Sequence, residues 1–144
     1  MPDLPSLVPP GISLSRQLVV TPALTVQAVV PDLPPVYATP HMIMFMEIVC
    51  TELIRPYLPA GWVSVGARVD VRHLAATPVG FTVTATARVL EVTKSLVVFA
   101  VEAHDGMAWI GRGEHDRAPV ELQRFLAGCA RKQSAANEAA REPT

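Results

Sequence analysis

A single long apolar helix followed by alternating segments limits what this chain can fold into more than any other feature. We expect the helix to begin at Thr39-Pro40 and to run to about Tyr57, because Thr is a favoured N-cap, Pro fits the first helical position, and prolines surround Tyr57. Upstream, residues 12–30 are rich in β-branched and apolar residues and are interrupted by Thr21-Pro22, which predicts two short strand segments, the second partly irregular.

The residues after the helix alternate between apolar and polar side chains, as strands with one buried face do. Four such segments follow one another: WVSVGARVDVRH, FTVTATARVLEV, KSLVVFAVEAHD and MAWIGRGEHDRAPV. In the first, the alternation predicts one face formed by Val63, Val65, Ala67, Val69, Val71 and His73, and the other by Ser64, Gly66, Arg68, Asp70 and Arg72. An antiparallel meander of this kind has one apolar face that must be covered. The sequence therefore predicts an α+β chain with the hot-dog fold, in which an antiparallel sheet wraps around one long central helix.

We expect one hot-dog domain over residues 12–126. Residues 1–11 are proline-rich and lack periodicity, which predicts a flexible N-terminal arm. A short helix is expected from Glu121 to about Lys132, and residues 127–144 are expected to form a C-terminal tail that is frayed at its end. Edge-to-edge pairing of two sheets would remove an exposed strand, so we expect a homodimer, or a dimer of such dimers.

Composition excludes several classes of function. The formal net charge is -1 and there is no basic stripe, so nucleic acid is not an expected partner. No apolar stretch approaches the roughly 18 residues of a membrane span, and the N-terminus lacks the cationic start of a signal peptide. Two cysteines are too few for a disulfide framework, and Cys50 lies in an apolar helical run, so we expect a cytoplasmic protein.

Three residues could carry acid–base or nucleophilic chemistry, and each has an ordinary structural alternative. Glu47 lies at the border of the apolar arc of the helix, either as a desolvated and reactive carboxylate or as part of a solvated stripe. His73 ends the apolar face of a strand, either as a general base or as a histidine bonded to a backbone carbonyl. Thr39 is an N-cap in its own right, and a helix N-terminus also offers unpaired N–H groups to an oxyanion.

Gly66 and Arg117 are candidates for contact with a ligand. Gly66 interrupts the strand WVSVGARV. A glycine there indicates either a bulge or a place where the backbone comes close to a ligand. Arg117 is either a surface charge or a phosphate contact. His115 and Asp116 are neighbours on a predicted strand and so point to opposite faces, which prevents them from binding one metal ion together. With four histidines and no Cys or Asp cluster we expect no metal site, and no Gly-rich phosphate loop or dinucleotide fingerprint predicts a cofactor.

Three blocks of the chain, VYATPHMIMFMEIVC, VGARVDVRHLAATPVG and VEAHDGMAWIGRGEHDRAPV, resemble the fluoroacetyl-CoA thioesterase family of hot-dog proteins, over residues 12–125. The resemblance implies hydrolysis of an acyl-CoA in a homodimer with sites near the subunit interface, with no cofactor besides the CoA of the substrate. It implies that Glu47 acts as nucleophile or orients the attacking water, that His73 is the general base, and that Thr39 positions Glu47 or the carbonyl oxygen. Gly66 would contact the substrate through its backbone, and Arg117 falls on the arginine that ends the strand EHDR.

One departure from this family concerns the acyl group. The fluoroacetyl-specific branch carries aromatic residues before the YAT block, where this chain has Val30 and Leu33. The resemblance therefore implies a short or medium acyl thioester and does not extend to fluoroacetyl-CoA. Two other functions stay open: a hot-dog hydratase or dehydratase, which the absence of an Asp-x-x-Pro-x-His-like segment disfavours, and a non-catalytic acyl-thioester-binding dimer, which would tolerate loss of Glu47 and His73.

Overall fold

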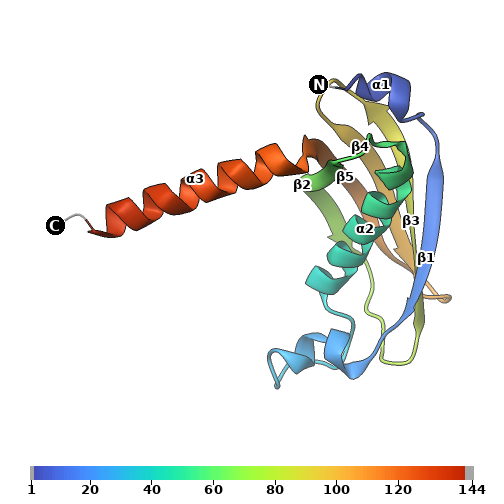
Figure 1. The fold of residues 1–144 in the computed structure, drawn as a ribbon. Helices are drawn as coiled ribbons and strands as arrows, with labels where there is room; N and C mark the ends of the chain where they lie inside the picture. The colour runs from blue at the N-terminus through green and yellow to red at the C-terminus, as the bar shows by residue number, and fades with distance from the viewer. Residues whose placement is uncertain (1, 142–144) are drawn as a thin grey trace.

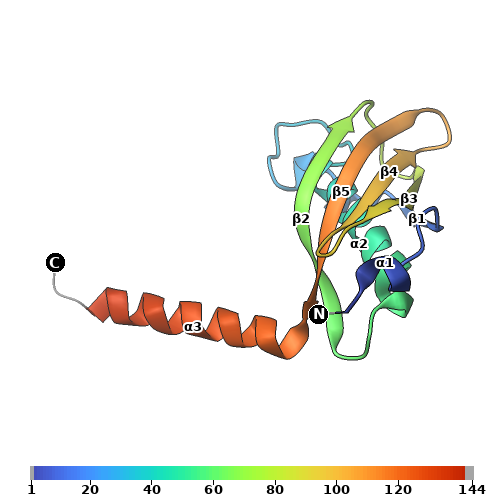
Figure 2. The same ribbon diagram turned by 90° about the horizontal axis from the view of Figure 1, so that it is seen from above.

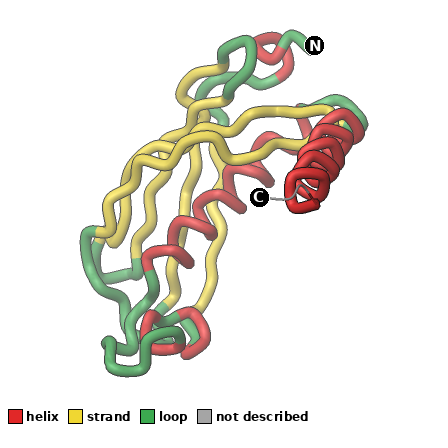
Figure 3. Tube along the Cα trace, turned by 90° about the vertical axis from the view of Figure 1, so that its left-hand side faces the viewer, coloured by secondary structure: helices red, strands yellow, loops and turns green. Residues whose placement is uncertain are grey.

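Five antiparallel strands form one sheet in the computed structural model, which describes residues 2–141. The strand order is β1-β3-β4-β5-β2 (Figures 1 and 2). The sheet curves around the helix α2 (Thr39–Ile54), as Figure 3 shows, and this confirms the predicted α+β hot-dog fold. The strands are β1 (Ser13–Val19), β2 (Trp62–His73), β3 (Thr82–Val92), β4 (Val97–His104) and β5 (Trp109–Glu121).

The core lies between α2 and the inner face of the sheet. The apolar arc of α2 buries Met42, Met46, Val49, Cys50, Leu53 and Ile54. These side chains pack against alternate residues of β3 and β4, among them the fully buried Val83 and Phe99. Gly111 on β5 lets the helix come close, because a Cβ there would lie 2.6 Å from Sδ of Met42. A short 3-10 turn over Arg55–Tyr57 ends the helix, where the sequence predicts its end.

The second strand segment predicted within residues 12–30 is wrong. After β1 the chain forms two 3-10 turns, Pro22–Leu24 and Val26–Ala28. Pro22 has no N–H to offer a strand ladder, and the Thr25 hydroxyl donates to the Pro22 carbonyl over 2.8 Å, which stabilises a turn. The chain then leads into α2 over an irregular loop.

The N-terminal segment is packed against the fold, which corrects the prediction of a flexible arm over residues 1–11. Helix α1 (Leu4–Leu7) occupies part of it, and the side chains of Leu4 and Val8 are fully buried. The two residues lie one helical turn apart and so point to the same side. The Gly11 N–H donates to the Val89 carbonyl over 2.8 Å, which ties the segment to β3.

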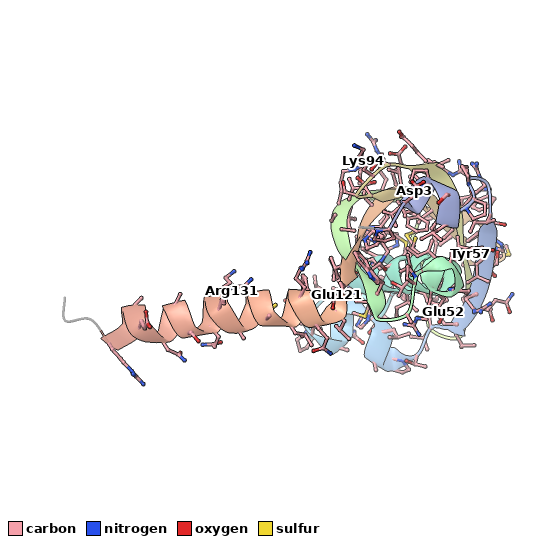
Figure 4. The ribbon with its side chains drawn as sticks, turned by 45° about the horizontal axis from the view of Figure 1, so that its top comes forward. Asp3, Glu52, Tyr57, Lys94, Glu121 and Arg131 are labelled. Atoms are coloured by element: carbon pink, nitrogen blue, oxygen red, sulfur yellow. The ribbon has the colours of Figure 1, made fainter. Side chains whose placement is uncertain are left out.

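Helix α3 (Leu122–Arg141) runs much further than the short helix predicted to end near Lys132, so residues 127–141 are not a frayed tail. Alanine, the strongest helix former, occurs six times among residues 127–141. The helix projects from the body (Figures 1 and 2), and its side chains, Arg131 among them, stand clear of the sheet in Figure 4. Within residues 2–141, neither α3 nor any other helix is long and apolar enough to cross a membrane.

A β-bulge in β2 decides which side chains reach the helix. Gly66 pairs with Arg117 of β5 and Arg68 pairs with Asp116, so Ala67 has no opposite residue in the register. The predicted alternation is therefore wrong for the first half of the strand. Ser64 and Gly66 face α2 together with His73, because the extra residue reverses the faces at position 67.

Candidate active site

Thr39 and His73 meet at the N-terminal end of α2. Oγ1 of Thr39 lies 2.7 Å from Nδ1 of His73, the last residue of β2. The N-cap is Ala38, and no side chain caps the helix, so the prediction that Thr39 is the cap is wrong. As the first helical residue, Thr39 stands among the N–H groups that a helix leaves unpaired. The prediction that Thr39 and His73 act in one site is consistent with this contact.

The surroundings of His73 favour its neutral imidazole. Burial lowers its pKa below the ordinary histidine value, against an opposing effect of the Ala75 backbone. Its Nε2 is buried and has no hydrogen-bond partner among residues 2–141, so one ring nitrogen remains for a ligand. An open cavity of about 520 Å³ adjoins the pair. Its lining consists of Val26, Val36, Tyr37, Ala38, Thr39, Pro40, His73, Leu74, Ala75 and Ala76.

Glu47 lies two turns further along α2, in a second group of residues. Its side chain is 35% exposed, and within residues 2–141 its carboxylate receives no hydrogen bond. A Cβ built on Gly66 would lie 3.0 Å from Oε1 of Glu47, 3.4 Å from Cε1 of His115 and 3.7 Å from Nη1 of Arg117. Both predicted explanations of Gly66 therefore apply, since it lies at a bulge and another group comes close to it. That group is the carboxylate of Glu47.

Arg117 is buried beside this carboxylate. Its Nε donates to Oγ of Ser64 and its Nη2 to the Ser64 carbonyl, both over 2.8 Å. Burial lowers the pKa of the Arg117 guanidinium, but arginine begins so far above neutrality that the group keeps its charge. The neighbouring Cys50 is no competing nucleophile, because burial raises the pKa of its thiol to about 12.

The sequence interpretation missed His115, which is only 1% exposed and lies beside both Glu47 and Arg117. The spacing to Arg117 could have indicated it, because residues two apart on a strand share a face and Arg117 was already a candidate. Asp116 points the other way and binds Nε of Arg68 over 2.8 Å. His115 and Asp116 therefore lie on opposite faces, as predicted.

The two groups of residues are separate within one protomer. Thr39 and Glu47 are eight positions apart on α2, which at about 1.5 Å per residue places their backbones roughly 12 Å from each other. The structure brings Thr39 to His73, and Glu47 to Gly66 and Arg117. It does not bring Glu47 to His73 of the same chain.

Comparison with known proteins matches the region that contains both groups. The model of the fluoroacetyl-CoA-specific thioesterase family matches residues 20–123. A fluoroacetyl-CoA thioesterase from Streptantibioticus cattleyicolor is 38% identical over 131 residues, which are 87% of this chain and 94% of that protein. A solved structure of the fluoroacetyl-CoA thioesterase FlK has a TM-score of 0.83 at 37% identity, covering 87% of this chain and 97% of that one. A Thermus thermophilus protein described as a thioesterase superfamily member has a TM-score of 0.85 at 30% identity, covering 90% and 96% of the two chains. The chain belongs to the fluoroacetyl-CoA-specific thioesterase family.

Proposed function

We propose that this protein hydrolyses a short or medium acyl-CoA to the free acid and CoA. The observation that carries the proposal is Glu47: a half-buried carboxylate that receives no hydrogen bond within residues 2–141, beside a buried cation, in a chain of a thioesterase family. A carboxylate with free oxygens can attack a carbonyl carbon or take a proton from water. The mostly apolar cavity beside Thr39 and His73 offers space for an acyl chain.

Two routes fit these residues. In the covalent route an oxygen of Glu47 attacks the thioester carbon, the C–S bond breaks, and CoA leaves as a thiolate that later takes a proton from solvent. Water, deprotonated by His73, then cleaves the resulting anhydride. In the direct route, Glu47 orients the water, His73 takes its proton, and the hydroxide attacks the thioester carbon. The C–S bond then breaks, and the CoA thiolate takes the proton from His73. Thr39 and the N-terminal N–H groups of α2 would hydrogen-bond the carbonyl oxygen as it gains charge.

A homodimer would join the two groups of residues into one site. β2 lies at the edge of the sheet, and all residues from Gly66 to Asp70 are exposed. If two β2 strands pair antiparallel with the two-fold axis at Asp70, Arg68 lies opposite Arg72 of the other protomer, and, because Ala67 is the extra residue of the bulge, Gly66 lies opposite His73. Because the bulge turns both residues to the same face, Glu47 would then meet the partner's Thr39 and His73. A dimer of such dimers remains a prediction.

The proposed thioesterase activity is tested by measuring thiol release from acetyl-, fluoroacetyl-, butyryl- and octanoyl-CoA. We expect Glu47→Gln and His73→Asn each to lower kcat by about 100-fold or more on the preferred substrate. Glu52→Gln is the matched control, since Glu52 is also on α2 but pairs with Arg16 over 2.9 Å. If the wild type releases no more thiol than Glu47→Gln on any substrate, the proposal fails. An acyl adduct at Glu47 in acid-quenched single turnovers would select the covalent route.

The composite site is tested by mixing the two inactive variants. In a heterodimer of Glu47→Gln and His73→Asn, one site carries both substitutions and the other carries neither, if each site takes Glu47 from one chain and His73 from the other. A 1:1 mixture that is unfolded and refolded together should therefore regain about a quarter of wild-type activity by statistical pairing. No recovery, in a mixture shown to exchange chains, would mean that each site lies within one protomer.

Two smaller proposals concern the setting of the reaction. The proposed chemistry uses side chains and the CoA of the substrate, with no metal or further cofactor. Cys50 is buried and Cys129 exposed, and neither forms a disulfide. Free thiols are usual in a reducing compartment, which supports a cytoplasmic location.

A further inference from the structure

The hydrogen bonds of His115 fix which of its ring nitrogens carries the proton. Nδ1 lies 2.7 Å from the backbone carbonyl of Arg68, and a carbonyl can only accept, so Nδ1 carries the hydrogen. Nε2 lies 3.1 Å from Nη1 of Arg117, and a guanidinium can only donate, so Nε2 offers its lone pair. His115 is therefore neutral. Burial lowers the pKa of His115, which agrees with this assignment.

His115, and not the nearby carboxylate of Glu47, bonds the guanidinium of Arg117. Nε2 of His115 is 3.7 Å from Oε1 of Glu47, which is too long for a hydrogen bond, and the neutral ring has no proton there to share. Arg117 has no ion pair with Glu47 within 4.0 Å among residues 2–141, although Nη1 of Arg117 and Oε1 of Glu47 both border the space above Gly66. One of the two Nη1 protons goes to the imidazole, and among residues 2–141 the carboxylate of Glu47 receives no hydrogen bond from Arg117.

We propose that His115 is a positioning residue, which holds the guanidinium of Arg117 off the carboxylate of Glu47 and so keeps the oxygens of Glu47 free for the thioester. The inference rests on the proposed role of Glu47. A charge near but not bonded to a carboxylate favours its ionised form, while a direct bidentate pair would occupy the oxygens that must react. The anchoring of Arg117 by Ser64 on its other side completes the arrangement.

Two substitutions separate this role from simple packing. Asn in place of His115 keeps a donor for the Arg68 carbonyl and loses the acceptor for Arg117. Gln keeps an acceptor near the position of Nε2 and loses the donor at Nδ1. Each variant therefore loses one buried hydrogen bond, and the expected loss of stability is similar for the two.

In His115→Asn the Arg117 guanidinium should turn to Glu47. We expect kcat to fall about 10-fold or more, because the guanidinium would then occupy the oxygens of Glu47 that must react. His115→Gln should keep most of the wild-type rate. The other ionisable groups close enough to act on this cluster, Cys50 on α2 and Asp116 on the opposite face of β5, are the same in both variants.

A second readout does not need turnover. At pH 7 the ¹³C signal of the Glu47 carboxyl, assigned with Glu47→Gln, should move in His115→Asn, where the guanidinium contacts the carboxylate, and keep its wild-type position in His115→Gln. If Glu47→Gln stays active while this signal still moves, the proposed role of Glu47 fails and the contact stands. Equal rates and equal Glu47 signals in the two variants would overturn the inference. In wild type alone, ¹⁵N signals that show a proton on Nε2 of His115 at pH 7 would also overturn it, even if His115→Asn does not fold.

Discussion

Oγ1 of Thr39 and Nδ1 of His73 lie 2.7 Å apart, although 34 residues separate them in the chain. The contact joins the first residue of α2 to the last residue of β2, so the closing of the sheet over the helix sets the orientation of the imidazole. A histidine whose Nδ1 is occupied presents Nε2 to a ligand.

Substitutions of Thr39 should therefore act through the hydroxyl. Thr39→Ser keeps the hydroxyl and should retain kcat within about 3-fold. Thr39→Val keeps the shape of the side chain but not the hydroxyl, and it should lower kcat about 10-fold or more because the general base loses the contact that orients it. Steady-state thiol release at saturating substrate measures both. Equal rates for the Ser and Val variants would show that the hydroxyl has no role.

Gly66→Ala tests how closely Glu47 fits against β2. The added Cβ would lie 3.0 Å from Oε1 of Glu47, so the carboxylate must move by a few tenths of an ångström. A small displacement of a reacting group can reduce the rate about 100-fold, and we expect kcat to fall by 10- to 100-fold. Gly128→Ala on α3, where the nearest atom is 3.6 Å away, is the control. A Gly66→Ala enzyme with wild-type kcat would show that the carboxylate tolerates the shift.

The free energy of unfolding should decrease as the pH falls below the ordinary pKa of histidine. Burial lowers the pKa of His73 and of His115. The unfolded chain, whose histidines have pKa values near 6.5, therefore binds more protons in mild acid than the folded chain does. Their contribution is complete above about pH 6.5 and is lost as the pH falls toward their lower folded values. Urea unfolding at pH 7.5 and pH 5 should give a smaller free energy of unfolding at pH 5. The difference should shrink in His115→Gln.

Leu4→Ala tests whether the N-terminal segment belongs to the core. Leu4 is fully buried, and the loss of a buried leucine side chain costs about 2–5 kcal/mol. Leu33→Ala, at a leucine that is 40% exposed, should change the free energy of unfolding by less than about 0.5 kcal/mol. Equal urea midpoints for the two variants would indicate that residues 1–11 behave as the arm predicted from the sequence.

The helix and most of the sheet could be predicted because their signals are periodic and local. The apolar arc of α2 and the alternation of β3 and β4 agree with the structure. The N-terminal segment could not be predicted this way, because Leu4 and Val8 form one helical turn, too short for a period. His115 was missed for a different reason. Its spacing to Arg117 indicated a shared face, but its neighbours Glu47 and Arg68 come from other elements, so the strand pattern alone did not show that this face meets Glu47.

Ala67 has a consequence for how this strand can change over evolution. Its side chain bears no reactive group, and it has no opposite residue in β5. Replacement by another small residue should therefore be harmless. Its deletion would remove the bulge but keep Gly66 and His73 on one face of β2, because the two residues would then lie six positions apart in a regular strand. One added residue that paired regularly between them would instead put them on opposite faces, much as a frameshift changes every codon beyond it. In this strand, selection should therefore act more strictly against such an insertion than on the identity of Ala67.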